Sequence, residues 1–133
     1  MLADGLEWPS ACYLLAFDGD DVVGVVGVEP LLDSALLRSL YVVESHRHRE
    51  IGRRLVMAAR KAAHTRGARQ LFLFGTKAGE FLRRVGFQPA TLDEMTRALK
   101  GTPHTDYYLA RPQELAREVA YRLDISRDGI IER

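Results

Sequence analysis

The feature that most constrains this fold is a change of hydrophobic period in the middle of the chain. The run ALLRSLYVV, residues 35–43, is apolar on both faces except at Arg38 and Ser39, which is typical of a strand inside a sheet. From Ile51 the apolar residues recur at helical spacing with arginines on the opposite side, and Gly67 is predicted to end this helix. A buried strand therefore leads directly into an amphipathic helix.

A second buried strand follows this helix closely. QLFLFG, residues 70–75, is short and apolar, so the strand, helix and strand predict a parallel pair joined by a right-handed crossover. Residues 11–30 read as a β-hairpin that turns at Asp18-Gly19-Asp20, where glycine can take the positive φ of a tight turn. Further along we expect helices over residues 77–85, 92–99 and 113–123 and a strand over residues 105–110. The predicted fold class is α/β, a mixed, mostly antiparallel central sheet with one parallel strand-helix-strand unit and flanking helices.

Composition limits the class of protein. A chain of 133 residues has the size of one compact domain, so we expect residues 1–133 to form a single domain. Its net charge of +1 gives no overall field to attract nucleic acid or an anionic membrane, so any anion site must be local. The single cysteine, Cys12, excludes an intrachain disulfide and a cysteine-based zinc cluster. We expect a cytoplasmic protein with no metal, no nucleic-acid partner and no membrane span.

Positive charge is concentrated in residues 46–54, which contain four arginines and one glutamate. This turn lies between a strand end and a helix N-terminus, where backbone N–H groups are unpaired and the helix dipole is positive. Cations there oppose the dipole unless an anion is bound, so a phosphate group is the simplest explanation for them. A solvated arginine face is the alternative. Neither a Walker motif nor a G-x-G-x-x-G fingerprint is present.

The segment LRSLYVVESHRHREIGRRLVMAARKAAHTRGARQLFLF resembles motif A of the GNAT superfamily of acyl-CoA N-acyltransferases. In that family a strand, an Arg/Gln-x-x-Gly-x-Gly/Ala turn and a helix bind the diphosphate and pantetheine of acetyl-CoA, and Arg47-His48-Arg49-Glu50-Ile51-Gly52 is similar to this turn. AGEFLRRVGFQPA, residues 78–90, resembles the family's next motif. LLRSLYV and LFLFGTKAGEFLRRVGFQPATLDEM resemble the short amino-acid-type subgroup, which includes arsenic-resistance N-acetyltransferases and the catalytic domain of N-acetylglutamate synthase.

The resemblance implies a GNAT-like sheet that lacks the family's usual first strand and helices, because the chain begins just before the second strand. A homodimer is expected to cover the apolar sheet that this leaves exposed. The resemblance also implies an enzyme that moves an acetyl group from acetyl-CoA to the amine of a small molecule, such as an amino acid or amino-acid-like compound. The amine attacks the thioester directly. The implied coenzyme-binding residues are Leu40, Tyr41, Val42, Arg47, His48, Arg49, Glu50, Ile51, Gly52 and Arg53.

Two departures from the family pattern leave an alternative open. Glu50 replaces the first glycine of the turn, and Leu82 stands where the family often has a tyrosine that protonates the departing thiolate. A non-catalytic acyl-CoA-binding or interaction module is therefore the second reading of the chain.

Several residues are candidates for the chemistry. Glu29 and Glu44, each expected at a strand end, can serve as the base, or they are ordinary surface carboxylates. Thr76 can donate a proton to the thiolate, or it caps the following helix. Arg38 is costly to bury without an anionic partner, so it either clamps a substrate carboxylate or forms an ion pair with a nearby Asp or Glu.

Overall fold

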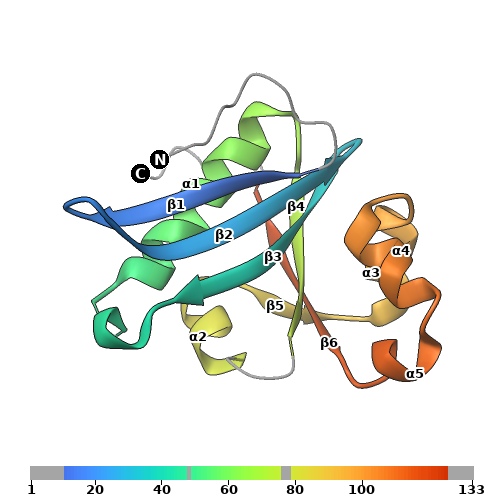
Figure 1. Ribbon diagram of the computed structural model, residues 1–133. Coiled ribbons are helices and arrows are strands. Elements are labelled where there is room, and N and C mark those ends of the chain that lie inside the picture. The colour runs from blue at the N-terminus through green and yellow to red at the C-terminus, as the bar shows by residue number, and fades with distance from the viewer. Residues whose placement is uncertain (1–10, 48, 76–78, 126–133) are drawn as a thin grey trace.

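The computed structural model describes residues 11–47, 49–75 and 79–125, and in this part of the chain one six-stranded sheet organises the fold (Figure 1). The strands are β1 (Cys12–Asp18), β2 (Asp21–Leu31), β3 (Ser34–Val42), β4 (Gln70–Gly75), β5 (Gln88–Ala90) and β6 (Val119–Asp124). The helices are the 3-10 turn η1 (Glu44–His46), α1 (Ile51–Thr65), α2 (Gly79–Arg84), α3 (Leu92–Leu99), α4 (Pro103–Leu109) and α5 (Pro112–Leu115). None of these helices is long and apolar enough to cross a membrane.

The parallel unit lies where the sequence predicts it. The strand order is β1-β2-β3-β4-β6-β5, and Ser34–Leu37 of β3 pairs in parallel with Gln70–Leu73 of β4. The other neighbouring strands run antiparallel. Helix α1 connects β3 to β4 and stops just before Gly67, which takes a φ of +95°. The predicted fold class, a mostly antiparallel sheet with one parallel pair, is confirmed.

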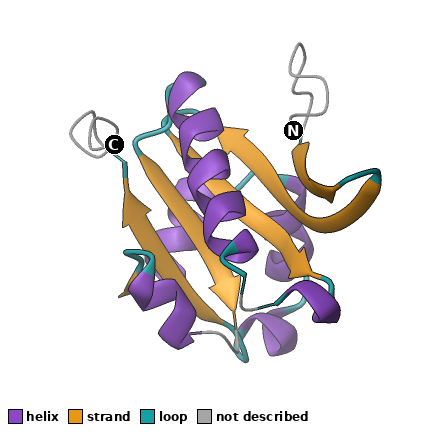
Figure 2. Cartoon of the chain, turned by 90° about the vertical axis from the view of Figure 1, so that its left-hand side faces the viewer, coloured by secondary structure: helices purple, strands orange, loops and turns teal. Residues whose placement is uncertain are grey.

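The sheet separates two hydrophobic cores. One core lies between the sheet and helices α1 and α2, and Leu37, Leu55 and Leu71 belong to it. The other lies under α3, where Leu36 and Phe72 pack against Met95 and Leu99. Figure 1 shows α1 and α2 on one side of the sheet and α3, α4 and α5 on the other, and Figure 2 looks onto α1 in front of the strands. The first half of β3, Ser34–Leu37, is buried on both faces, in agreement with its apolar sequence.

Two predicted elements in the second half are wrong. Residues 105–109 of the expected strand lie in helix α4. Of the helix expected over residues 113–123, residues 113–115 lie in helix α5, but residues 119–123 lie in strand β6. In α4, Pro103 occupies the first turn and Thr105 and Tyr108 turn inward at helical spacing, while the paired tyrosines give a misleading strand signal.

Strand β6 is a strand because of its neighbours rather than its own sequence. It pairs with β4 on one side and with β5 on the other, so its backbone donors and acceptors are satisfied by two ladders. This pairing outweighs the helical spacing of its apolar residues, which is only a weak preference. Of the helix predicted over residues 77–85, the structure describes Gly79–Arg84 as α2.

Candidate active site

Strand β3 leaves β4 halfway along its length. The last residues that pair are Leu37 and Leu73, and beyond them β4 pairs only with β6. At the same point β3 has a β-bulge in its pairing with β2. Val25 pairs with Tyr41 and Gly27 pairs with Arg38, so β3 has one more residue than β2 between these two pairs. Ser39, within this bulge, has a φ of +57°. Beyond Leu37, no strand among the described residues pairs with β3 on the side of β4, and only the carbonyl of Val42 is engaged there, by Arg47.

A cleft of about 620 Å³ lies beside the unpaired end of β3. Most of the predicted coenzyme-binding residues line it, together with Phe81 and Arg84 from α2. The predicted coenzyme-binding residues in the lining are Leu40, Tyr41, Val42, Arg47, Glu50, Ile51, Gly52 and Arg53. The sequence therefore identified one continuous surface that runs from a strand to the start of a helix.

The helix that opens onto this cleft has an uncapped N-terminus. The side chain of Glu50, the N-cap residue of α1, makes no capping hydrogen bond, and the first turn of α1 contains no acidic residue. Its first N–H groups therefore keep their partial positive charge, and an anion is the ligand that such an end favours.

A fixed cation stands beside this helix end. Arg47 Nε donates a hydrogen bond of 2.8 Å to the carbonyl oxygen of Val42, and the Arg47 guanidinium lies 5.3 Å from the ring centroid of Tyr41. Both contacts hold the charge at the mouth of the cleft, so less side-chain entropy is lost when an anion binds.

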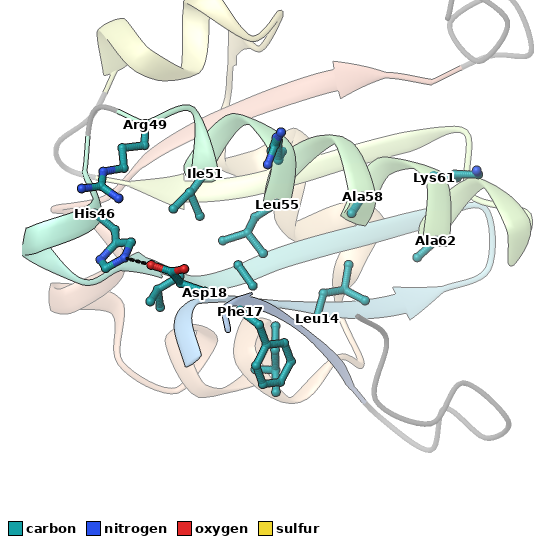
Figure 3. Close-up of a pocket in the computed structure, with 14 residues that line it drawn as sticks. Leu14, Phe17, Asp18, His46, Arg49, Ile51, Leu55, Ala58, Lys61 and Ala62 are labelled. Atoms are coloured by element: carbon teal, nitrogen blue, oxygen red, sulfur yellow. Dashed lines mark hydrogen bonds and ion pairs between the residues drawn. The ribbon is translucent and has the colours of Figure 1, made fainter. Parts of the chain in front are cut away.

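The arginines of the turn do not all face the same cleft. Arg49 lines a second groove, of about 630 Å³, between β1 and α1, and its walls include Leu14 and Leu55 (Figure 3). At one end of this groove His46 Nε2 lies 2.8 Å from Asp18 Oδ2, and the hydrogen bond to His46 lowers the pKa of the Asp18 carboxyl. The contact ties the basic turn to the β1–β2 hairpin.

Glu50, which stands where the resembled motif has its first glycine, has a backbone conformation that suits glycine. Its φ of +67° lies in the left-handed region, which costs about 1–2 kcal/mol for a residue with a Cβ atom. The side chain is 70% exposed, and Glu50 Oε1 lies 3.8 Å from Arg53 Nη1. The substitution therefore keeps the turn's shape at a cost in strain and places a negative charge at the cleft.

We expect Glu50→Gly to stabilise the protein by about 0.5–1 kcal/mol, because glycine takes this φ without strain but loses more entropy on folding. It should also tighten coenzyme A binding several-fold, since it removes a negative charge near the diphosphate. Urea unfolding and calorimetric titration measure the two effects. Glu50→Ala is the matched control, because it removes the charge and keeps the strain. Equal stability of the glycine and alanine variants would contradict this account.

The structure separates the two candidate carboxylates. Glu44 opens η1 just after β3 and is exposed, as expected of a strand-end residue. Glu29 is not at a strand end but inside β2, and it is fully buried. Its Oε2 forms an ion pair with Arg38, and its Oε1 accepts a hydrogen bond of 3.1 Å from the backbone N–H of His104. With both oxygens engaged, Glu29 is poorly placed to take up a substrate proton.

The remaining predicted residues fall into three groups. Arg38 forms the ion pair that was one of its two predicted roles, and its use as a clamp for a substrate carboxylate stays a prediction. Thr76 and His48 lie outside the described residues. Leu82 is buried in the core beside α1, and a leucine supplies no acidic proton.

Sequence reasoning missed an aromatic cluster around His104. The ring centroid of His104 lies 5.9 Å from that of Phe74 and 5.2 Å from that of Tyr108. Burial and the nearby Arg38 charge lower the pKa of His104. Burial and Glu118, whose Oε2 accepts a hydrogen bond of 3.1 Å from Tyr108, raise the pKa of Tyr108. One sequence signal was available for this cluster. Thr102-Pro103 is a typical helix start, and in a helix His104 and Tyr108, at i and i+4, lie on the same face.

Comparison with known proteins identifies this arrangement. The sequence profile of the GNAT acetyltransferase domain matches residues 9–89. A search of curated protein sequences finds no relative of this chain.

Several solved structures share the fold. N-acetylglutamate synthase from Neisseria gonorrhoeae, complexed with coenzyme A and N-acetyl-glutamate, is 21% identical with a TM-score of 0.71, and the match covers 86% of this chain and 26% of the synthase. Rv2747 from Mycobacterium tuberculosis, in complex with coenzyme A, is 20% identical with a TM-score of 0.68, over 86% of this chain and 76% of Rv2747. The PaiA N-acetyltransferase from Thermoplasma acidophilum, also with coenzyme A, is 17% identical with a TM-score of 0.64, over 86% of this chain and 61% of PaiA. The chain thus spans about a quarter of the length of the synthase.

Proposed function

The chain belongs to the GNAT acetyltransferase family, and from this premise we propose that it transfers an acetyl group from acetyl-CoA to the amine of a small molecule. The observation that carries the proposal is the uncapped start of α1 next to Arg47, in a cleft that continues along the unpaired end of β3. This cleft offers donors for a diphosphate at one end and free backbone for an extended chain at the other.

Each part of the cleft has a role in binding acetyl-CoA. The first-turn N–H groups of α1 donate to the diphosphate, and Arg47 and Arg53 balance its charge. The backbone of Leu40 to Val42 pairs with the pantetheine amides as a neighbouring strand would. This places the thioester where β3 and β4 separate, and one N–H of β3 can polarise its carbonyl oxygen. Much of the rate then comes from holding the reacting groups in line.

We infer that the acceptor is an amino acid or an amino-acid-like amine. The likeness to N-acetylglutamate synthase, which was crystallised with N-acetyl-glutamate, supports this choice. Arg38, whose side chain is 27% exposed, is the candidate to bind an acceptor carboxylate while it remains paired with Glu29.

Thiol release with acetyl-CoA and a panel of amino acids and primary amines tests the proposal. We expect coenzyme A to bind with measurable heat and at least one amine to release free thiol. Tight binding without thiol release on any amine would favour the alternative, a non-catalytic acyl-CoA-binding module, to which Glu50 and Leu82 point. Absence of heat with well-folded protein would exclude both.

A further inference from the structure

We infer that His104 is the general base that removes a proton from the acceptor amine. The inference rests on the proposed function and adds to it a residue from α4, a helix outside the segment that matches the family profile. Its basis is the position of the imidazole relative to the point where β3 and β4 part.

The first residues beyond the last paired rung of these strands are Arg38 on β3 and Phe74 on β4. Side chains alternate along a strand, and Leu36 and Phe72 face α3, so Arg38 and Phe74 face the same side. Their contacts agree with this. Phe74 packs on the core under α3, and Arg38 pairs with Glu29, which in turn binds the N-terminus of α4.

His104 stands over this point. Its ring centroid is 5.9 Å from that of Phe74, and its backbone N–H is held by Glu29, the partner of Arg38. Tyr108, one turn further along α4, packs edge-on against the imidazole at 5.2 Å. The imidazole is therefore fixed at the end of the paired region, on the face opposite α1 and α2.

The cleft of about 620 Å³ beside the end of β3, here called the coenzyme cleft, opens on the other face of the sheet. Leu40, Val42 and Phe81, which line the cleft, pack against the core beside α1. A thioester that reaches the separation of β3 and β4 from that side presents its carbonyl carbon toward the face where His104 lies. An amine that attacks from the α4 side then meets the carbonyl and the imidazole together.

The surroundings of His104 have unused hydrogen-bonding capacity. Within the described part of the chain, neither imidazole nitrogen has a hydrogen-bond partner, and Arg38 Nε and Thr105 Oγ1 are buried without one. Because the imidazole is only half-buried and its nitrogens are unpaired, it can accept a proton from a polar molecule that reaches it.

The charges around the ring suit a base that works near neutral pH. Burial and Arg38 lower the pKa of His104, while Glu29 and Glu118 raise it by less. Tyr108 also faces the ring, and its own raised pKa keeps it protonated at neutral pH. The imidazole is therefore neutral when a small amine is still an ammonium ion.

The proposed step balances in protons and electrons. One ring nitrogen of His104 takes a proton from the ammonium form of the acceptor, and the freed lone pair forms an N–C bond to the thioester carbonyl. The C–S bond breaks with its electron pair on sulfur. The second amine proton passes to the thiolate, which leaves as free thiol, and His104 returns its proton to water.

His104→Asn tests the assignment with the acceptor of the amino acid panel that gives the fastest thiol release. We expect kcat to fall about 100-fold, with the KM for acetyl-CoA nearly unchanged. The pKa of His104 is lowered by burial and by Arg38, so the wild-type kcat/KM should decline with acid only below the ordinary range of an imidazole. The variant should lack that limb of the profile. His64→Asn is the matched control, because His64 lies at the far end of α1, and it should behave as wild type.

A second measurement needs no variant to fold. Acetonyl-CoA, a ketone analogue that cannot donate an acetyl group, should shift the NMR ring-proton resonance of His104 and leave that of His64 in place. Bound acetonyl-CoA with an unmoved His104 resonance, or a folded His104→Asn protein with wild-type kcat and pH profile, would overturn the assignment and leave the proposed function standing. Wild-type protein that neither binds coenzyme A nor releases thiol would remove both.

Discussion

Replacing Arg38 by methionine is expected to lower the free energy of unfolding by about 3 kcal/mol. The substitution keeps an unbranched side chain in β3 and removes the counter-charge of Glu29, which is fully buried in β2. Only the backbone N–H of His104 then remains to stabilise the Glu29 carboxylate. A buried charge without a partner costs several kcal/mol, whereas removal of both charges of a pair is often close to neutral.

Replacing the other member of the pair, Glu29, by methionine should lower the free energy of unfolding by less. Glu29→Met leaves Arg38 without its carboxylate, but 27% of the Arg38 side chain is already exposed and its guanidinium can turn toward water. We expect a loss of about 1–2 kcal/mol for this variant and a smaller loss for the double variant than for Arg38→Met alone. Urea unfolding of the two single variants and the double variant forms a complete cycle. Equal losses for the two single variants, or a double variant whose loss is their sum, would contradict this picture of the pair.

Reversing the charge of Arg47 and Arg53 together is expected to weaken coenzyme A binding about 100-fold, or roughly 2.7 kcal/mol. Both side chains line the cleft at the start of α1, and each reversal replaces attraction to a diphosphate by repulsion. Calorimetric titration of the Arg47→Glu/Arg53→Glu protein measures the change. The difference from wild type should shrink as salt is added, because exposed charges are screened.

Arg49→Glu provides the control for this prediction. Arg49 belongs to the same basic turn but lines the groove beside β1 rather than the coenzyme cleft. We expect its charge reversal to change coenzyme affinity by no more than about threefold, the residual long-range effect of one surface charge. An Arg49→Glu protein as impaired as the Arg47→Glu/Arg53→Glu protein would show that the anion binds on the other side of the turn.

The middle of the chain was predictable because its structure depends on local signals. The apolar run of β3, the helical spacing from Ile51 and the glycine at position 67 each determine conformation over a few residues, and together they predicted the parallel unit and the basic turn.

The errors lie where contacts with residues distant in the sequence determine the local conformation. Val119–Asp124 has helical spacing, but it lies between β4 and β5 and takes its conformation from them. Ser39 was conspicuous as a polar residue in an apolar strand, yet its left-handed conformation depends on the register with β2. His104 reaches the site only because a helix takes the place of the predicted strand, so no local pattern could bring it beside Phe74.

The connection between β5 and β6 has a consequence for how such a protein can diversify. Ala90 and Ala120 are paired across these two strands, so residues 91–118 leave the sheet and return to it at adjacent points. A different connection with the same two ends can be grafted there, provided that it covers Leu36 and Phe72 as α3 does. If His104 and Tyr108 contact the acceptor, exchanging this one stretch would retarget the enzyme to another amine, while the thioester-binding surface on the opposite face would be inherited intact.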